Sequence, residues 1–435
     1  MLIGIPYLHL INWYTFKVAM HDTNIINIPF QAPYVRHLGG VEFGLVADLQ
    51  YFGVKSYGGI RFDVDTGKVE YYDIKHPFEK LPSSFADMAV KVYHHTKNTI
   101  PYIALNASPK FLQGHNVYGT DYVYELVCEM LGVLRDSYPV LWSFLDVQNA
   151  HFARIDVTYS ARLPTDDMMF EVIDMIGRVK TKYRFPDNKR NIFANTRYWG
   201  QAVNRVGYCK MYGKNNEVAD TMKSLRRKAR ADNRQAHYLL DTVFTPELEQ
   251  FAKNLLRFEA TNKKQMLENM GMPSNIWQFM LYQKNNPDCM FKMWKFWFAE
   301  IFDSMRGEVS MTLDDSEVLR LCKEKLTTIT PKGKISYTKA MHAYNFYIIL
   351  RSKGFNNTKQ TTNEKTFYRN IKLLVDIGIS KAHLQNLNGR EIKTVPLIEL
   401  IQIDFANQTP PNYQPVKSRY SGEFDKYLNP LRIVA

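Results

Sequence analysis

The chain has 435 residues, of which 45% are hydrophobic and 14% aromatic, a composition that excludes a disordered chain. Lysine and arginine outnumber aspartate and glutamate by 56 to 43, and the resulting charge of +13 favours a polyanionic partner, although ordinary solubility charge is the alternative. The four cysteines form no zinc-binding spacing, and no apolar run is long enough to predict a membrane span.

Hydrophobic periodicity predicts strands first and then a mixture of helices and strands. Residues 1–14 predict an opening strand, and the region 40–106 predicts mainly strands, with a hairpin at 58–74. Helices are expected at 122–136, 139–147, 165–182 and 218–240, and strands at 152–162, 192–199, 204–213 and 255–261. From residue 262 the pattern is almost wholly helical.

This order predicts an α+β fold, with a mostly antiparallel sheet, flanking helices and a mainly helical C-terminal domain. We expect the domain boundary near 304–315, which gives a first domain over 1–305 and a second over 311–435.

Three of the predicted strands each have one polar face, because side chains two residues apart point the same way. In chain order, the polar residues are Arg154 and Asp156, then Tyr208, Lys210 and Tyr212, then Arg257, Glu259 and Thr261. If these strands are neighbours, one surface gathers carboxylates, tyrosine, lysine and arginines, a combination suited to phosphoryl transfer.

In that chemistry, Asp156 and Glu259 would hold Mg²⁺ or Mn²⁺ through oxygen atoms, Tyr208 would attack a phosphate, and Lys210 would stabilise the developing charge. The alternative is a surface ion pair beside ordinary strand tyrosines. Spacing does not choose between Tyr208 and Tyr212, which a helix would also align.

Two further features point to ligands. His115 and Asn116 lie on a glycine-flanked loop, where they could contact a metal or a phosphate, or simply bond to the backbone of a turn. The segment 222–237 has almost no acid and suggests a phosphate-binding helix face. Its cations are Lys223, Arg226, Arg227, Lys228, Arg230 and Arg234.

Several blocks of the sequence resemble the gene II replication proteins of filamentous phages. The blocks are "NASPKFLQGHNVYGTD", "ARIDVTYSAR", "VGYCKMYGK", "LLRFEA", "TTITPKGKISYTKA" and "VPLIELIQIDFANQTPPNYQPV". The resemblance runs from about residue 76 to 416, so it covers most of the chain.

The resemblance implies a rolling-circle replication initiator. Such a protein nicks the viral strand of double-stranded phage DNA at the plus origin and later rejoins the displaced single strand into a circle. It implies a phosphotyrosine link, Mg²⁺ or Mn²⁺ and no nucleotide cofactor. Host helicase and polymerase, a homo-oligomer on the origin and the host bacterial cytoplasm are the expected partners and location.

The resemblance places the family's nucleophile on Tyr208, with Lys210 as its helper, and the family's Arg-x-Asp strand on Arg154 and Asp156. Glu259 resembles an Arg-x-Glu element of plasmid initiators. The broader superfamily's His-hydrophobic-His pair is absent, so the expected metal ligands are Asp156, Glu259 and His115. Ala104 occupies a position where an acid is expected.

The C-terminal residues 365–380 resemble the second helix of a helix-turn-helix. This helix would present Lys365, Tyr368, Arg369 and Lys372 to DNA; the alternative is an ordinary helix pair with a basic outer face. In the family, a C-terminal product is also made from an internal start, which would be Met311 or Met305 here.

Two other functions are compatible with the sequence. One is a DNA-binding replication regulator without catalysis, and the other is a mobilisation relaxase or transposase.

Overall fold

The computed structural model describes most of the chain. The described residues are 20–46, 58–62, 69–73, 79–83, 85–166, 169–177, 179, 181, 184–187, 195–305, 315–331, 333–379, 381–387, 403–404 and 407–428. The predicted opening strand at 1–14 and the candidate start Met311 lie outside these ranges.

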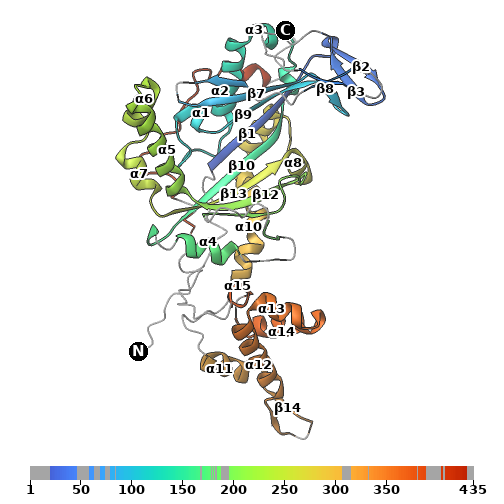
Figure 1. Cartoon of the computed structure of the whole chain (residues 1–435), viewed down its shortest axis with the longest axis vertical. Coiled ribbons are helices and arrows are strands. Elements are labelled where there is room, and N and C mark those ends of the chain that lie inside the picture. The colour runs from blue at the N-terminus through green and yellow to red at the C-terminus, as the bar shows by residue number, and fades with distance from the viewer. Residues whose placement is uncertain are drawn as a thin grey trace.

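An eight-stranded antiparallel sheet organises the N-terminal part of the molecule (Figure 1). Its spatial order is β11-β12-β13-β10-β1-β9-β7-β6. The strands are β1 (Met20–Pro29), β6 (Glu79–Pro82), β7 (Asp87–Tyr93), β9 (Tyr102–Ala107), β10 (His151–Arg162), β11 (Thr196–Trp199), β12 (Gly207–Gly213) and β13 (Leu255–Lys263). Because β1 and β10 occupy the centre, the residues that they carry are enclosed by neighbours on both sides.

Shorter strands form two accessory sheets. β2 (Val35–Gly39), β3 (Glu42–Leu45) and β8 (His95–Lys97) make a three-stranded sheet. β4 (Gly58–Phe62) and β5 (Val69–Asp73) pair as the predicted hairpin.

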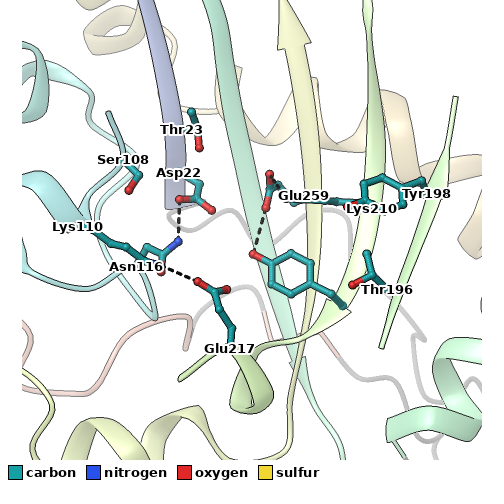
Figure 2. Close-up of a pocket in the computed structure, with 11 residues that line it drawn as sticks. Asp22, Thr23, Ser108, Lys110, Asn116, Thr196, Tyr198, Lys210, Glu217 and Glu259 are labelled. Atoms are coloured by element: carbon teal, nitrogen blue, oxygen red, sulfur yellow. Dashed lines mark hydrogen bonds and ion pairs between the residues drawn. The ribbon is translucent and has the colours of Figure 1, made fainter. Parts of the chain in front are cut away.

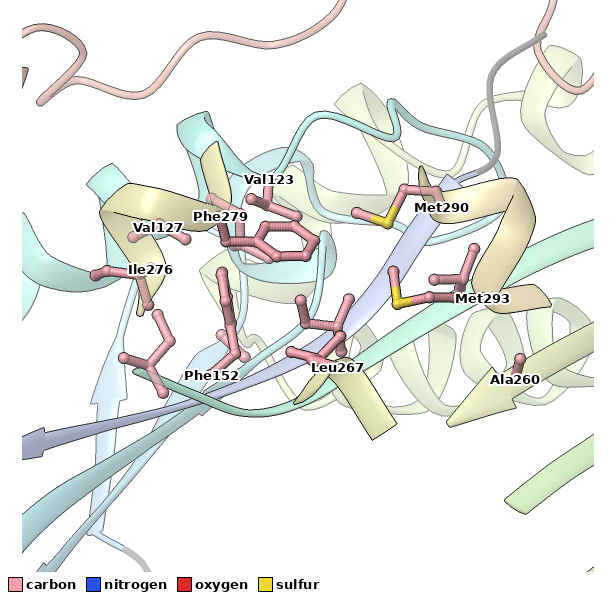
Figure 3. Packing of buried hydrophobic residues seen from close by; sticks show 14 of the residues in the cluster. Val123, Val127, Phe152, Ala260, Leu267, Ile276, Phe279, Met290 and Met293 are labelled. Atoms are coloured by element: carbon pink, nitrogen blue, oxygen red, sulfur yellow. The ribbon is translucent and has the colours of Figure 1, made fainter. Parts of the chain in front are cut away.

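Helices cover one face of the large sheet and bury its apolar side chains. The helices of this region are α1 (Lys110–Gln113), α2 (Tyr124–Ser137), α3 (Pro139–Ser143), α4 (Met169–Gly177), α8 (Lys264–Asn269), α9 (Ile276–Asn285) and α10 (Cys289–Met305). Figure 3 shows part of the layer, in which Phe279 packs edge-on against Phe152 at 5.3 Å between ring centroids. Trp294 of α10 donates a hydrogen bond to the carbonyl of Phe258, so α10 lies directly on β13. The opposite face of β10, β12 and β13 is thereby left for polar residues.

The predicted helix 218–240 is two helices, which corrects that expectation. α5 (Lys214–Arg230) begins earlier, and the chain then turns through Asp232, which has φ of 60°. Asn233 caps α6 (Arg234–Thr242) by accepting a hydrogen bond from the Ala236 N–H at 2.8 Å. With α7 (Pro246–Ala252), these helices enclose a small core of their own.

The C-terminal helices surround a separate core. They are α11 (Asp315–Leu326), α12 (Thr338–Lys353), α13 (Phe355–Thr361), α14 (Glu364–Asp376) and α15 (Lys381–Asn386). The sequence analysis did not predict the hairpin of β14 (Thr328–Ile329) and β15 (Ile335–Ser336) between α11 and α12. The α+β class with a mainly helical C-terminal region is confirmed.

The last described segment, 407–428, returns to the sheet region. The Gln408 side chain pairs with the backbone of Ser160: its amide donates to the carbonyl at 3.0 Å and its oxygen accepts from the N–H at 2.8 Å. Arg419 binds the carboxylate of Glu129 on α2 at 2.8 Å. Phe424 is 2% exposed within the sheet core, so this segment packs on the first of the two predicted domains.

None of the helices in the described part of the chain is both long and apolar enough to cross a bilayer.

A glycine on α2 makes room for the returning segment. A Cβ on Gly132 would lie 2.1 Å from Cγ of Tyr420, whose hydroxyl donates to Asp136 at 2.7 Å. We expect Gly132→Ala to lower the free energy of unfolding by ~1–3 kcal/mol in urea titrations, because the ring must move.

The matched test is a double-mutant cycle. In Gly132→Ala with Tyr420→Ala, the ring is gone, so the combined loss should be smaller than the sum of the single losses. Strict additivity would contradict the contact.

Candidate active site

A β-bulge in β1 turns Asp22 toward the polar face of the sheet. The register with β10 shifts between His21, opposite Val157, and Asn24, opposite Ile155. Bulges insert an extra residue and redirect side chains, and here both Asp22 and Thr23 line the pocket described below. Asp22 was not predicted as a site residue, because β1 was not predicted as a strand. The isoleucine-rich run Ile25–Ile28, interrupted only by Asn27, was the available signal, because β-branched residues favour strands.

The three strands with predicted polar faces are neighbours, so their polar residues can form one surface. β12 pairs with β13, which pairs with β10. Lys210 stands opposite Glu259, and its ammonium group lies 2.9 Å from the carboxylate. Tyr208 stands opposite Thr261, which stands opposite Asp156, so the tyrosine, lysine and both carboxylates share one surface.

A pocket of about 340 Å³ opens on this surface (Figure 2). Its lining residues are Asp22, Thr23, Ser108, Lys110, Asn116, Thr196, Tyr198, Lys210, Tyr212, Glu217 and Glu259. The lining is polar, with cations and carboxylates placed around one volume, which is a suitable environment for a phosphate and a metal ion.

Glu259 is the electrostatic centre of this pocket. Burial raises its pKa to about 8; attraction from Lys210 lowers the pKa, and repulsion from Asp22 and Asp156 raises it further. Burial lowers the pKa of Lys210, but Glu259 and Asp156 outweigh burial and raise it. An added cation beside Glu259 would therefore be stabilised.

Tyr212 is bound to the same carboxylate. Its hydroxyl donates to Glu259 Oε2 at 3.1 Å, and burial together with Glu259 raises its pKa well above the ordinary value. The neutral phenol is strongly favoured at this position.

A second network fixes Asp22. Lys214, fully buried at the start of α5, donates to Asn116 Oδ1 at 2.7 Å and to Glu217 at 2.6 Å. The Asn116 amide then donates to Asp22 Oδ1 at 3.0 Å. Buried Arg257 donates to the backbone carbonyl of Asn116, so the loop carrying this asparagine is held to β13.

These contacts shift the pKa values of Lys214 and Asp22, which lie at the two ends of the network. Burial, followed by repulsion from Arg257, lowers the pKa of Lys214 to about 7. Burial raises the pKa of Asp22, but Lys214 and Arg257 outweigh it and lower the value. Asn116 was noted beside His115 and Arg257 on the polar face of its strand, but the network itself was not predicted from the sequence, since its members come from separate elements.

Tyr208 lies beside Arg154. The guanidinium carbon is 5.8 Å from the ring centroid, and Arg154 also binds Asp156, with 2.7 Å from Nε to Oδ1. Gly207, with φ of 133°, allows the close approach of β12 to β13, because a Cβ there would lie 1.9 Å from the carbonyl oxygen of Thr261. Tyr208 is 8% exposed.

The expected metal ligands are placed as follows. Both oxygens of Asp156 bind Arg154, and those of Glu259 bind Lys210 and Tyr212. His115 accepts from the Val117 N–H at 3.3 Å, and its burial lowers its pKa to about 3. Among the described residues, no three His, Cys, Asp or Glu side chains are arranged to hold a metal ion. Three carboxylates, Asp22, Glu217 and Glu259, line the pocket, and Glu217 is bound to Lys110 and Lys214.

The expected DNA-binding side chains are all exposed, on two separate helices. Arg226, Arg227, Lys228 and Arg230 lie on α5, which starts at the pocket and carries them away from it. Lys365 and Arg369 are exposed on α14, together with Tyr368 and Lys372.

The burial of Lys214 predicts a pH dependence of stability. Its pKa of about 7 in the folded protein lies below the ordinary value of 10.5, so between these values the unfolded chain binds more protons. The free energy of unfolding should therefore rise with pH across this window, by up to about 1.4 kcal/mol per unit from this group. Lys214→Met should lose that rise in urea titrations at pH 7, 8 and 9.

Lys223→Met, on the exposed side of the same helix, is the matched control and should keep the wild-type slope. Equal slopes in wild type and Lys214→Met would show that Lys214 is charged when folded.

Comparison with known proteins gives a consistent result over nearly the whole chain. A family model for the N-terminal region of the phage gene II replication-associated protein matches residues 20–285, and a model for the C-terminal region of the same protein matches residues 329–418. No solved structure matches the chain.

Two relatives illustrate the similarity. The replication-associated protein of Salmonella phage IKe is 31% identical over 419 residues, covering 91% of this chain and 97% of the relative. The protein of the same name from Enterobacteria phage M13 is 32% identical over 414 residues, covering 91% and 99%. The chain therefore belongs to the gene II family of filamentous phage replication-associated proteins.

Proposed function

We propose that this replication protein nicks one strand of the phage origin and later rejoins the displaced strand, with Tyr208 as the nucleophile. The observation that carries the proposal is the shared surface of β10, β12 and β13. There a tyrosine, two cations and paired carboxylates stand beside a polar pocket.

The proposed cleavage exchanges one phosphodiester for another. The Tyr208 hydroxyl loses its proton and its oxygen forms a bond to phosphorus, while the bond from phosphorus to the 3′ oxygen breaks and that oxygen takes up one proton to become the 3′-OH. The 5′ phosphate stays on the tyrosine. Attack by a later 3′-OH reverses the exchange and closes the circle, so no nucleotide cofactor is needed.

Arg154 and Lys210 have distinct parts in this scheme. The Arg154 guanidinium lies beside the Tyr208 ring, where its positive charge would stabilise the negative charge that the tyrosine oxygen carries as it attacks. Lys210, 23% exposed at the pocket, stabilises the charge that builds up on the phosphate.

The pocket also fits Mg²⁺ or Mn²⁺. Asp22 and Glu259 would hold the ion, because magnesium is commonly bound by one or two carboxylates together with water and substrate phosphate. A bound ion would polarise the scissile phosphate. Asp156 could join this set only by releasing Arg154, and His115 would have to leave its contact with Val117.

The exposed basic faces of α5 and α14 would bind the duplex and the single strand of the origin. Host helicase and polymerase would then use the 3′ end in the bacterial cytoplasm, and the initiator would act there as an oligomer on the origin. A non-catalytic regulator would need the basic faces but not the pocket, and a relaxase or transposase would not need to circularise its product.

The nucleophile is tested by substitution on β12. Tyr208→Phe should abolish nicking of a supercoiled plasmid that carries the plus origin, and should abolish the covalent protein–DNA adduct on a suicide origin substrate. Peptide mapping of the wild-type adduct should identify Tyr208.

Tyr212→Phe is the control, because it removes a hydroxyl from the same strand but leaves Tyr208 in place. If Tyr208→Phe still cuts, the hydroxyl of Tyr212, which donates to Glu259, becomes the nucleophile. If no variant, including wild type, forms an adduct, the regulator function replaces the enzyme.

The proposed metal site is tested by binding. We expect Asp22→Asn and Glu259→Gln each to weaken Mn²⁺ binding, measured by electron paramagnetic resonance, by at least about tenfold, since each removes an anionic ligand. Asp220→Asn, on the exposed part of α5, should bind Mn²⁺ as wild type does. Unchanged binding in both pocket variants would contradict the site.

A further inference from the structure

The hairpin β14–β15 projects from the C-terminal helical domain (Figure 1). Its turn is well formed: the Thr330 N–H donates to the Lys334 carbonyl at 2.8 Å, and the Gly333 N–H donates to the Thr330 carbonyl at 2.9 Å. Gly333 has φ of +73° with nothing near it, as a tight turn requires. The hairpin is therefore a defined ribbon of two residues per strand.

The ribbon exposes apolar side chains that the fold does not use. Ile329 and Ile335 stand directly opposite each other and are 75% and 63% exposed. Tyr337, which directly follows the hairpin, and Met341 on the first turn of α12 are also exposed, at 49% and 37%. A two-stranded hairpin with no packed face is marginal in water, and a contiguous exposed apolar surface marks an interaction site.

The charge around the hairpin indicates the partner. Residues 325–363 contain seven lysines and arginines and no aspartate or glutamate. Lys334 on the hairpin and Lys339 just after it are exposed. A narrow ribbon that combines a branched apolar pair with lysines matches the way proteins insert apolar wedges into the minor groove of DNA while cations bind the phosphates.

The position of α14 would allow this helix and the hairpin to contact the same DNA duplex. His342, one turn into α12 from the hairpin, lies 3.2 Å from Asn370 of α14, so α14 crosses α12 close to the ribbon. The exposed cations of α14 could occupy one groove while the ribbon reaches the next.

We infer that the β14–β15 hairpin is a second DNA-binding element, which inserts Ile329 and Ile335 into the minor groove of the duplex and bends it. The inference rests on the proposed function only in taking duplex DNA as the partner, and it does not depend on the nicking chemistry.

The test uses the full chain and a 40-base-pair duplex with an A·T-rich centre and a dye at each end. Fluorescence anisotropy gives the affinity, and energy transfer between the dyes gives the bend. The double variant Ile329→Ser with Ile335→Ser should bind at least about tenfold more weakly and should lose the bend signal. Ile349→Ser, which changes a 43% exposed isoleucine of α12 outside the ribbon, should behave as wild type.

A second variant tests the charge. Lys334→Gln should reduce the slope of log affinity against log salt by about 0.9, the value for one lost phosphate contact. Because this side chain is exposed at the turn, the variant should fold normally even if the double isoleucine variant does not.

Two results would overturn the inference: wild-type affinity and bend in the double variant, or an equal loss in Ile349→Ser. A protein or lipid partner for the hairpin would give the first of these. Nicking of a single-stranded oligonucleotide with the cleavage site should be unchanged in the hairpin variants. Failure of wild type in that assay would instead count against the nicking proposal alone.

Discussion

The crowding of like charges on one buried sheet face is the constraint on which the rest of the site depends. Asp22, Asp156 and Glu259 act on one another in a region poor in water, where each carboxylate costs free energy unless a cation compensates it. Arg154 neutralises Asp156, and Lys210 faces Glu259. The compensation is incomplete at Glu259, so the protein alone leaves a place for positive charge from outside.

Alternation along strands was sufficient to predict the shared face of β10, β12 and β13, because period-two patterns are local and these strands are amphipathic. It was insufficient for Asp22, since no strand was predicted at β1 and a bulge there also breaks the alternation at that residue. Lys214 was not predicted for another reason: the local sequence does not distinguish a buried lysine at the start of a helix from a solvated one. Its role depends on Asn116 and Glu217, which the fold brings to it.

In the helical regions, too, some features were predicted from the sequence and others were not. Apolar spacing predicted a helical C-terminal domain, and a basic run predicted one helix where the chain forms α5 and α6. The break depends on Asp232 in a left-handed conformation and on the cap supplied by Asn233, both of which are short polar signals inside a charged stretch. The hairpin β14–β15 was not predicted, because strands of two residues are too short to show a hydrophobic period in the sequence.

The pairing of Gln408 with Ser160 has a consequence for how force passes through the molecule. Within the described ranges, β1 pairs with β10 as far as Thr158, and just beyond that point the amide of Gln408 bonds to the backbone of Ser160 as a strand would. The C-terminal helices are thus tied to the large sheet at both of their ends, as an insertion is, rather than at one end, as a tail is. If these helices bind DNA as proposed, a pull on them would reach β10, the strand that carries Arg154 and Asp156, through two separate connections.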